Sequence, residues 1–401
     1  MKKIIIMLIS CVLLTGCGTY KLEDATKDFT KSVESSKSYK LNGVMEISSG
    51  EEIFTYNIET YYLKDDYYKV ILVNQTNNHK QVILKNKDGL YVVTPSLNKS
   101  FKFDSIWPEN SSQSYLLQNL LNDVKSDNNK EFISENNKYI IKCKVNYPNN
   151  EDLTYEKIYF NKDMKIEKVE VYSKDDLVKI KAEFKSVDLK AKLKEDDFKL
   201  SSLIDTSKTK DNSSNETTEN KNTNNTNQNN QGQDSNIENK DNQDKDTQNK
   251  NATNNNEESG NVSNADTKEE DTKTCENETC DKKSSLVDNI IYPLYIPANT
   301  HLQSSETVET DGADRVILTF AGDKNFVIVE ETLKASDEFE IIPVLGDPLL
   351  LDKTIAVISN NSISWHADNM SYYLVSSDLS SSELVSVATS LGNSKTVVST
   401  K

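Results

Sequence analysis

The stretch Phe54-Thr55-Tyr56-Asn57-Ile58-Glu59-Thr60 decides the fold class. Large apolar side chains alternate in it with polar ones, and successive side chains of a β-strand point to opposite faces of a sheet. The same alternation returns in residues 139–145, where Tyr139, Ile141 and Cys143 are separated by lysine or isoleucine. Turn-forming clusters of Asn, Asp, Gly and Pro divide the surrounding sequence into about eleven short strands. This pattern predicts a meandering antiparallel sheet with one buried face.

Two amphipathic helices are expected to cover that sheet. The first carries Leu22, Ala25, Phe29 and Val33 at helical spacing, and the second has a broad leucine stripe between residues 112 and 125. A sheet of short antiparallel strands that is covered by helices on one face is typical of an α+β domain. We therefore expect a curved antiparallel half-barrel whose concave side is covered by the helices.

The last part of the chain predicts a second, smaller α+β domain. One hairpin is expected from residues 315–329 and another pair of strands from residues 362–375, because apolar runs flank turn residues in both. A final helix is the clearest local signal, since Ser380 and Glu383 form a capping box before an apolar stripe. The sequence does not indicate whether this domain docks on the first.

The middle of the chain sets the domain boundaries. Residues 206–285 contain no aromatic residue and no proline, and a segment this polar cannot bury enough surface to offset the entropy of ordering. The predicted organisation is a signal peptide at 1–16, a first domain at 17–205, a disordered, Asn-rich acidic linker at 206–285 and a small domain at 286–401.

Charge changes along these segments. Basic and acidic residues number 31 and 31 in residues 1–205, 10 and 17 in 206–285, and 6 and 16 in 286–401, and these balances of 0, −7 and −10 add to the net charge of −17. A nucleic-acid partner is excluded, because binding to phosphates needs a basic patch.

The N-terminus predicts export and lipid attachment. Two lysines precede an apolar run of eleven residues, Ile4 to Leu14. As a helix this run would be roughly 17 Å long, too short for a bilayer core of about 30 Å. Leu14-Thr15-Gly16-Cys17 resembles the bacterial lipobox, which implies that signal peptidase II cleaves between Gly16 and Cys17 and that Cys17 carries lipid, including palmitate-type acyl chains. The alternative is an ordinary secretory signal peptide.

Several further motifs resemble a known family. Residues 87–91, 94–98, 107–108 and 115–123 are similar to LolA-like lipoproteins of spore-forming bacteria, including YdcC-like sporulation and GerS-type germination lipoproteins. The resemblance implies a half-barrel with an apolar groove, for which Phe54, Tyr56 and Ile58 are candidate lining residues. The alternative for these side chains is ordinary core packing. The pairing of this domain with a smaller one also resembles the architecture of RseB/MucB regulators.

No catalytic, metal or cofactor motif is found. The three histidines (His79, His301, His366) stand outside any nucleophile or zinc signature. Cys143 lies on the apolar side of its strand and is expected to be a buried, inert thiol. Cys275 and Cys280 are expected to form a local disulfide or to stay as free thiols.

These observations lead to two functional hypotheses. The first is a non-enzymatic lipoprotein, anchored on the extracytoplasmic face of the cell membrane, that binds a partner protein or an apolar ligand. The resemblance implies sporulation or germination as its setting, an envelope or cortex-modifying protein as its partner, and an acyl chain as its ligand. The alternative is a lipid-binding carrier or an envelope-stress sensor that regulates a membrane partner.

Overall fold

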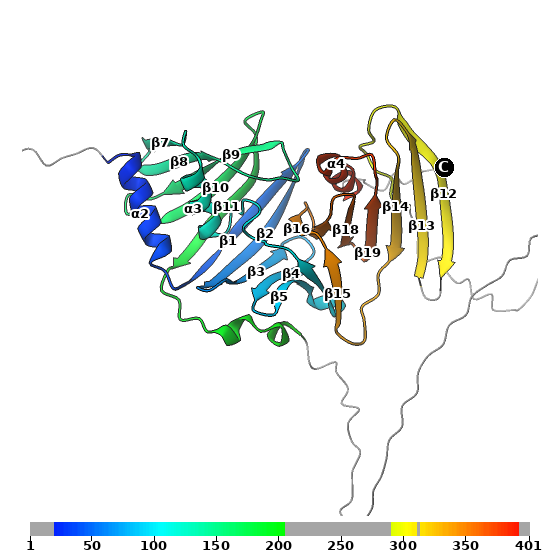
Figure 1. Cartoon of the computed structure of the whole chain (residues 1–401), viewed down its shortest axis with the longest axis horizontal. Helices are drawn as coiled ribbons and strands as arrows, with labels where there is room; N and C mark the ends of the chain where they lie inside the picture. Colours follow the sequence, from blue (N-terminus) through cyan, green and yellow to red (C-terminus); the bar gives the residue numbers. More distant parts are fainter. Residues whose placement is uncertain (1–19, 205–289, 311–312, 393–401) are drawn as a thin grey trace, which may run out of the picture. The chain divides into compact units, whose positions relative to one another are not determined.

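The computed structural model describes residues 20–204, 290–310 and 313–392 (Figure 1). We call residues 20–204 the N-terminal segment and residues 290–392 the C-terminal segment. Contacts place both segments in one compact unit. The described residues form two open sheets and a few helices, so this part of the chain is mostly β-structure. No helix in these residues combines the length and apolar composition needed to cross a membrane.

The larger sheet has twelve strands, eleven of them from the N-terminal segment, as the turn clusters predict. Its order is β15-β6-β5-β4-β3-β2-β1-β11-β10-β9-β8-β7, and neighbouring N-terminal strands are antiparallel. The strands are β1 (Ser38–Ser49), β2 (Glu52–Leu63), β3 (Tyr67–Asn74), β4 (Lys80–Asn86), β5 (Gly89–Thr94), β6 (Lys99–Asp104), β7 (Glu131–Glu135), β8 (Lys138–Lys144), β9 (Leu153–Phe160), β10 (Ile166–Ser173) and β11 (Val178–Asp188).

The period-two pattern predicts the buried face correctly. In β2, Tyr56 and Ile58 are buried, whereas Asn57 is exposed. β1 pairs with β2 along its whole length and with β11 through a bulge after Asn42. At Gly43 the backbone of β11 comes so close that a Cβ atom would lie 2.2 Å from the carbonyl oxygen of Glu183, which explains the glycine.

Helices α2 (Leu22–Glu34) and α3 (Leu117–Ser126) pack on one face of this sheet, as Figure 1 shows. Three residues of the predicted α2 stripe, Ala25, Phe29 and Val33, are buried, and Leu22 at the start of the helix is half-buried. Helix α3 begins later than the expected residue 112, because Ser112 is tied to Asn146 by its backbone N–H (2.8 Å) and by its hydroxyl (2.8 Å). Three short 3₁₀ helices complete the segment: η1 (Pro95–Leu97), η2 (Glu195–Phe198) and η3 (Leu200–Leu203).

The smaller sheet has seven strands in the order β12-β13-β14-β19-β18-β17-β16, all from the C-terminal segment. Both predicted strand pairs, β13 with β14 and β18 with β19, are confirmed. The strands of the C-terminal segment are β12 (Thr300–Thr310), β13 (Ala313–Gly322), β14 (Phe326–Thr332), β15 (Glu340–Leu345), β16 (Asp347–Leu350), β17 (Ile355–Ile358), β18 (Ser362–Ala367) and β19 (Met370–Val375).

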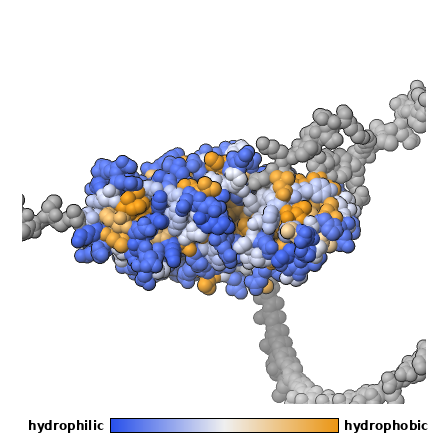
Figure 2. Space-filling model, turned by 90° about the horizontal axis from the view of Figure 1, so that it is seen from above, coloured by the Kyte–Doolittle hydropathy of each residue, from blue (hydrophilic) through white to orange (hydrophobic). Residues whose placement is uncertain are grey.

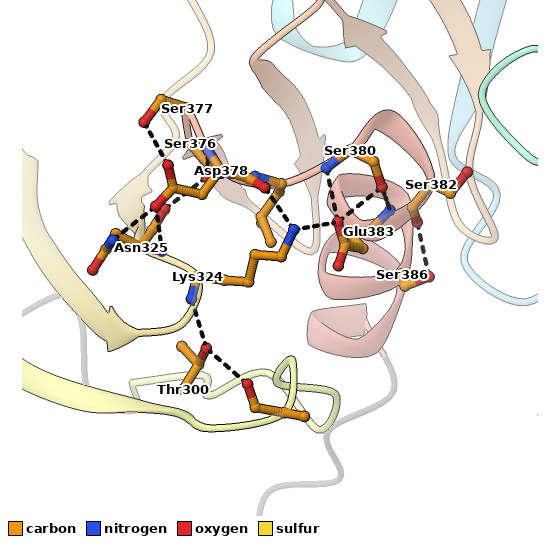
Figure 3. A network of polar contacts seen from close by, with 12 residues as sticks. Thr300, Lys324, Asn325, Ser376, Ser377, Asp378, Ser380, Ser382, Glu383 and Ser386 are labelled. Atoms are coloured by element: carbon orange, nitrogen blue, oxygen red, sulfur yellow. Dashed lines mark hydrogen bonds and ion pairs between the residues drawn. The ribbon is translucent and has the colours of Figure 1, made fainter.

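Helix α4 (Ser381–Gly392) covers one face of the smaller sheet and begins with the predicted capping box. The Ser380 N–H donates to Glu383 Oε2 (2.8 Å), and the Glu383 N–H donates to Ser380 Oγ (3.3 Å) (Figure 3). Lys324, from the turn between β13 and β14, donates to the carbonyl of Asp378 (2.9 Å) and contacts Glu383 (3.4 Å). This network fixes the start of α4 relative to the sheet.

Candidate functional site

A cavity of about 800 Å³ lies between the two segments and is the candidate functional site. Its volume is in the range of small-molecule sites. The apolar part of its lining comes from both segments, with Ile47, Ile83 and Ile180 on one side and Leu350 and Ile355 on the other. A ligand in this cavity would therefore contact both segments at once.

Helix α4 forms a second wall of a different character. Leu384, Val387 and Leu391 are buried against the smaller sheet, so the opposite side of the helix faces the cavity. The α4 residues that line the cavity are Ser382, Val385, Ser386, Thr389 and Ser390. Because four of these five are hydroxyl residues, the wall offers neutral hydrogen-bonding groups and no charge.

Ionisable residues lie at other parts of the lining. Lys174 pairs with Asp152 at 3.5 Å, and Glu151 and Lys179 also line the cavity. Asp352 is more deeply placed: burial raises the pKa of its carboxyl, and Oδ2 has no hydrogen-bond partner in the described residues. The cavity thus combines apolar, hydroxyl and charged surfaces, which suits an amphipathic ligand better than a purely hydrocarbon one.

The walls are held together by a seam of contacts between the segments. Strand β15 of the C-terminal segment pairs in parallel with β6 and so forms one edge of the larger sheet. Gln81, which is buried in β4, accepts hydrogen bonds from the Ile355 N–H (2.7 Å) and from the Thr354 hydroxyl (3.0 Å). The Tyr56 hydroxyl donates to the carbonyl oxygen of Asp352 (2.5 Å). These bonds satisfy polar groups that burial would otherwise leave unpaired.

The three candidate groove residues lie at this seam. Tyr56 and Ile58 belong to the same apolar cluster as Ile355 and Val357 of the C-terminal segment, and Phe54 packs against that cluster. None of the three lines the cavity. The structure thus places them where the C-terminal segment already covers the sheet, which agrees with the core-packing alternative.

The other predicted site residues have mixed outcomes. Gly16, Cys17, Cys275 and Cys280 lie outside the described residues, so lipid attachment and the disulfide stay predictions. Cys143 is buried as expected, and its burial raises the pKa of the thiol. A buried neutral thiol is a poor nucleophile.

Two of the three histidines lie between the segments, whereas His301 is exposed on the edge strand β12. His79 and His366 lie at the seam, and burial lowers the pKa of both imidazoles, that of His366 to about 4. The ring of His366 packs on Phe101 at 5.1 Å between centroids, so its role is packing between the segments. Within the described residues, no group of three His, Cys, Asp or Glu side chains could hold a metal ion.

Two features of the site were missed by sequence reasoning. The hydroxyl residues of α4 lie on the polar side of an amphipathic helix, which is typically exposed to solvent. The periodicity of the helix does not show that another part of the chain faces this side. Gln81 sits among alternating strand residues and carries no motif. A buried polar residue at a core position would have been the only signal for it.

Comparison with known proteins gives a relative that aligns with nearly the whole chain, although no family model matches it. The sporulation protein YdcC of Bacillus subtilis is 29% identical to it over 385 residues, which cover 96% of this chain and 94% of YdcC. The resemblance to YdcC-like sporulation proteins is confirmed. It spans both segments and not the N-terminal segment alone.

Some solved structures are also similar, at low identity. The MucA/MucB complex of Pseudomonas aeruginosa matches with 10% identity over 92% of this chain and 97% of that chain, at a TM-score of 0.29. A LolA superfamily protein of Nitrosomonas europaea matches with 11% identity over 45% and 99%, at a TM-score of 0.28. The CwlD–GerS complex of Clostridioides difficile matches with 16% identity over 43% and 98%, at a TM-score of 0.19. Likenesses this weak carry no inference about this chain.

Proposed function

We propose that this protein is a non-enzymatic, lipid-anchored envelope protein that acts in sporulation by binding a ligand in the cavity between its two segments. The near full-length resemblance to YdcC supports the sporulation setting. The cavity of about 800 Å³, with apolar and hydroxyl walls, is the observation that carries the binding role. The larger sheet is proposed to curve as a half-barrel around one side of this cavity.

The ligand class follows from the lining. Apolar side chains from both segments would hold an acyl chain or another hydrocarbon portion, because burying such groups contributes roughly 25 cal/mol per Å². The α4 hydroxyls and the charged residues would bind a polar head. We infer an amphipathic ligand, which a membrane-anchored protein would meet at the surface of its own bilayer.

A cavity-filling variant tests the binding role. Thr389 is half-buried on the cavity wall, so Thr389→Trp would place an indole in the cavity. Thr389→Ser is the control, because it keeps the hydroxyl and leaves the cavity open. Delipidated wild-type protein and the serine variant are expected to shift the emission of a fluorescent fatty acid, and the tryptophan variant is not. The binding role is wrong if wild-type protein leaves the probe unchanged.

The cellular role has its own test. Deletion of the gene is expected to lower the count of heat-resistant spores, and wild-type protein is expected to restore it. A Cys17→Ser chain is expected to leave the membrane fraction and to fail in restoring the spores. Normal spore counts after deletion would contradict the sporulation setting, whereas a membrane-bound Cys17→Ser chain would contradict the anchor alone.

A further inference from the structure

The start of the C-terminal segment presents an apolar patch that the cavity does not use. Of the large apolar side chains that are exposed in the described residues, five lie within eleven positions of the sequence. None of them lines the cavity. We call them the 292–302 patch: Tyr292 (44% exposed), Leu294 (69%), Tyr295 (42%), Ile296 (37%) and Leu302 (38%).

Core packing does not account for this patch. The chain that precedes β12 is fixed by Ile290 and Ile291, which pack on the core of the smaller sheet, and by two buried prolines, Pro293 and Pro297. The Ile291 N–H donates to the buried carboxylate of Glu330 (3.1 Å). Between these residues, the side chains of Tyr292, Leu294, Tyr295 and Ile296 keep between 37% and 69% of their surface exposed in the described part of the chain. Figure 2 shows apolar areas on the surface of the end of the molecule that the C-terminal segment forms.

The patch leads directly into a free sheet edge. Strand β12 pairs with β13 on one side, and no described strand pairs with its other side. It is eleven residues long and contains neither lysine nor proline, and after a register shift between Leu302 and Ser304 it pairs regularly with β13 from Ser304 to Thr310. Its backbone N–H and C=O groups can therefore accept an added strand, a common mode of peptide recognition.

Charge selects among possible occupants. Residues 286–401 contain 6 basic and 16 acidic residues, a net charge of −10, and β12 itself carries Glu306 and Glu309. A second copy would place acidic strands against each other, and an anionic bilayer would be repelled by the same charge. A segment with basic residues would be attracted, and its apolar side chains would be buried on the patch.

We propose that β12 and the 292–302 patch form a docking site for an extended segment of another protein in which basic and apolar residues alternate. The segment adds as a strand to the edge of β12, so its backbone provides affinity and its side chains provide specificity. Tyr292 and Tyr295 supply aromatic anchor points of the kind that dominate such interfaces, and Leu294 adds exposed apolar surface beside them. This surface stands apart from the cavity, so either proposal can fail without the other.

Labelled peptides and the full chain test this proposal. The probe is a nonapeptide in which lysine and valine alternate. Two control peptides replace lysine by glutamate or group the lysines and valines in separate blocks. The chain is expected to bind the alternating Lys–Val peptide at least tenfold more tightly than either control by fluorescence anisotropy, and the peptide is expected to slow amide exchange in β12.

Two matched variants locate the site. Leu294→Ser is expected to weaken peptide binding at least tenfold without loss of folding, because Leu294 is 69% exposed. Leu177→Ser, at a 57% exposed position of the N-terminal segment, is expected to leave binding unchanged. The proposal would be overturned if Leu294→Ser bound the alternating peptide within twofold of the wild-type affinity. It would also be overturned if the block peptide bound as tightly as the alternating one, or if amide exchange in β12 were unchanged by the peptide. Leu294-dependent dimerisation or Leu294-dependent binding to phosphatidylcholine vesicles, without peptide binding, would overturn it too.

Discussion

Glu330 should make the stability of the protein depend on pH in a way that one substitution removes. Its side chain is fully buried in β14, Oε2 accepts the Ile291 N–H, and Oε1 has no partner in the described residues. Burial raises the pKa of this carboxyl from 4.5 to about 7. The ionised form is therefore disfavoured in the folded state relative to the unfolded chain.

The sign and size follow from the pKa shift. A carboxyl with a raised folded pKa keeps its full contribution to stability below the unfolded pKa of 4.5 and loses it as pH rises to about 7. A rise of the carboxyl pKa from 4.5 to about 7 corresponds to roughly 3 kcal/mol of stability lost above pH 7. Glu330→Gln keeps an oxygen for the Ile291 N–H but cannot ionise. It should raise the free energy of unfolding by roughly 3 kcal/mol at pH 8 and by much less at pH 5.

Urea unfolding of both proteins at pH 5 and pH 8 measures this difference. Glu331→Gln is the matched control, because Glu331 lies on the opposite side of the same strand and pairs with Arg315 at 2.7 Å. It should show no gain at pH 8. An equal effect of Glu330→Gln at both pH values, or a loss of stability at pH 8, would refute the reasoning.

Three further predictions concern the seam and the buried core. Gln81→Leu should lower the free energy of unfolding by roughly 2–4 kcal/mol in urea titrations, because it leaves the buried Ile355 N–H and Thr354 hydroxyl without an acceptor. A loss below about 0.5 kcal/mol would contradict the role of Gln81 in joining the two segments. Glu156→Gln should stabilise the protein more at pH 8 than at pH 5 in the same assay, because burial and the nearby Asp123 raise the pKa of the Glu156 carboxyl far above its usual value. A variant that is less stable than the wild type at pH 8 would contradict this prediction. Cys143 should react with iodoacetamide only after unfolding, as peptide mass spectrometry can show, and labelling in the native protein would contradict its burial.

The sequence predicts local elements well because their causes are local. Alternation in residues 54–60 gives a strand with the correct buried face, and the pair Ser380 and Glu383 gives the start of α4. The eleven strands of the N-terminal segment follow from turn residues between apolar runs. Each of these signals depends on neighbours within a few positions.

The seam could not be predicted for the opposite reason. Strand β15 (Glu340–Leu345) contains Pro343 and pairs with β6, which lies more than 230 residues earlier in the sequence. The sequence of β15 contains no signal that predicts pairing with β6. Tyr56 and Ile58 show the same limit, because alternation states that their face is buried but does not state what covers it. The cavity forms only where the two segments meet, so its lining residues could not be predicted from the sequence either.

A cavity with walls from both segments couples ligand binding to their docking. A ligand that contacts Ile47 and Ile180 on one side and Ile355 on the other binds the docked state and not the separated one. By mass action it would stabilise docking by about 2.7 kcal/mol at a concentration 100 times its Kd. That gain is similar to the expected loss in Gln81→Leu, so the ligand should restore the stability of this variant toward that of the wild type. Thr389→Trp, which fills the cavity, should remove the effect of the ligand while Thr389→Ser keeps it. Urea unfolding with and without the ligand therefore tests the seam and the site together, and a ligand that stabilises Thr389→Trp as much as the wild type would bind somewhere else.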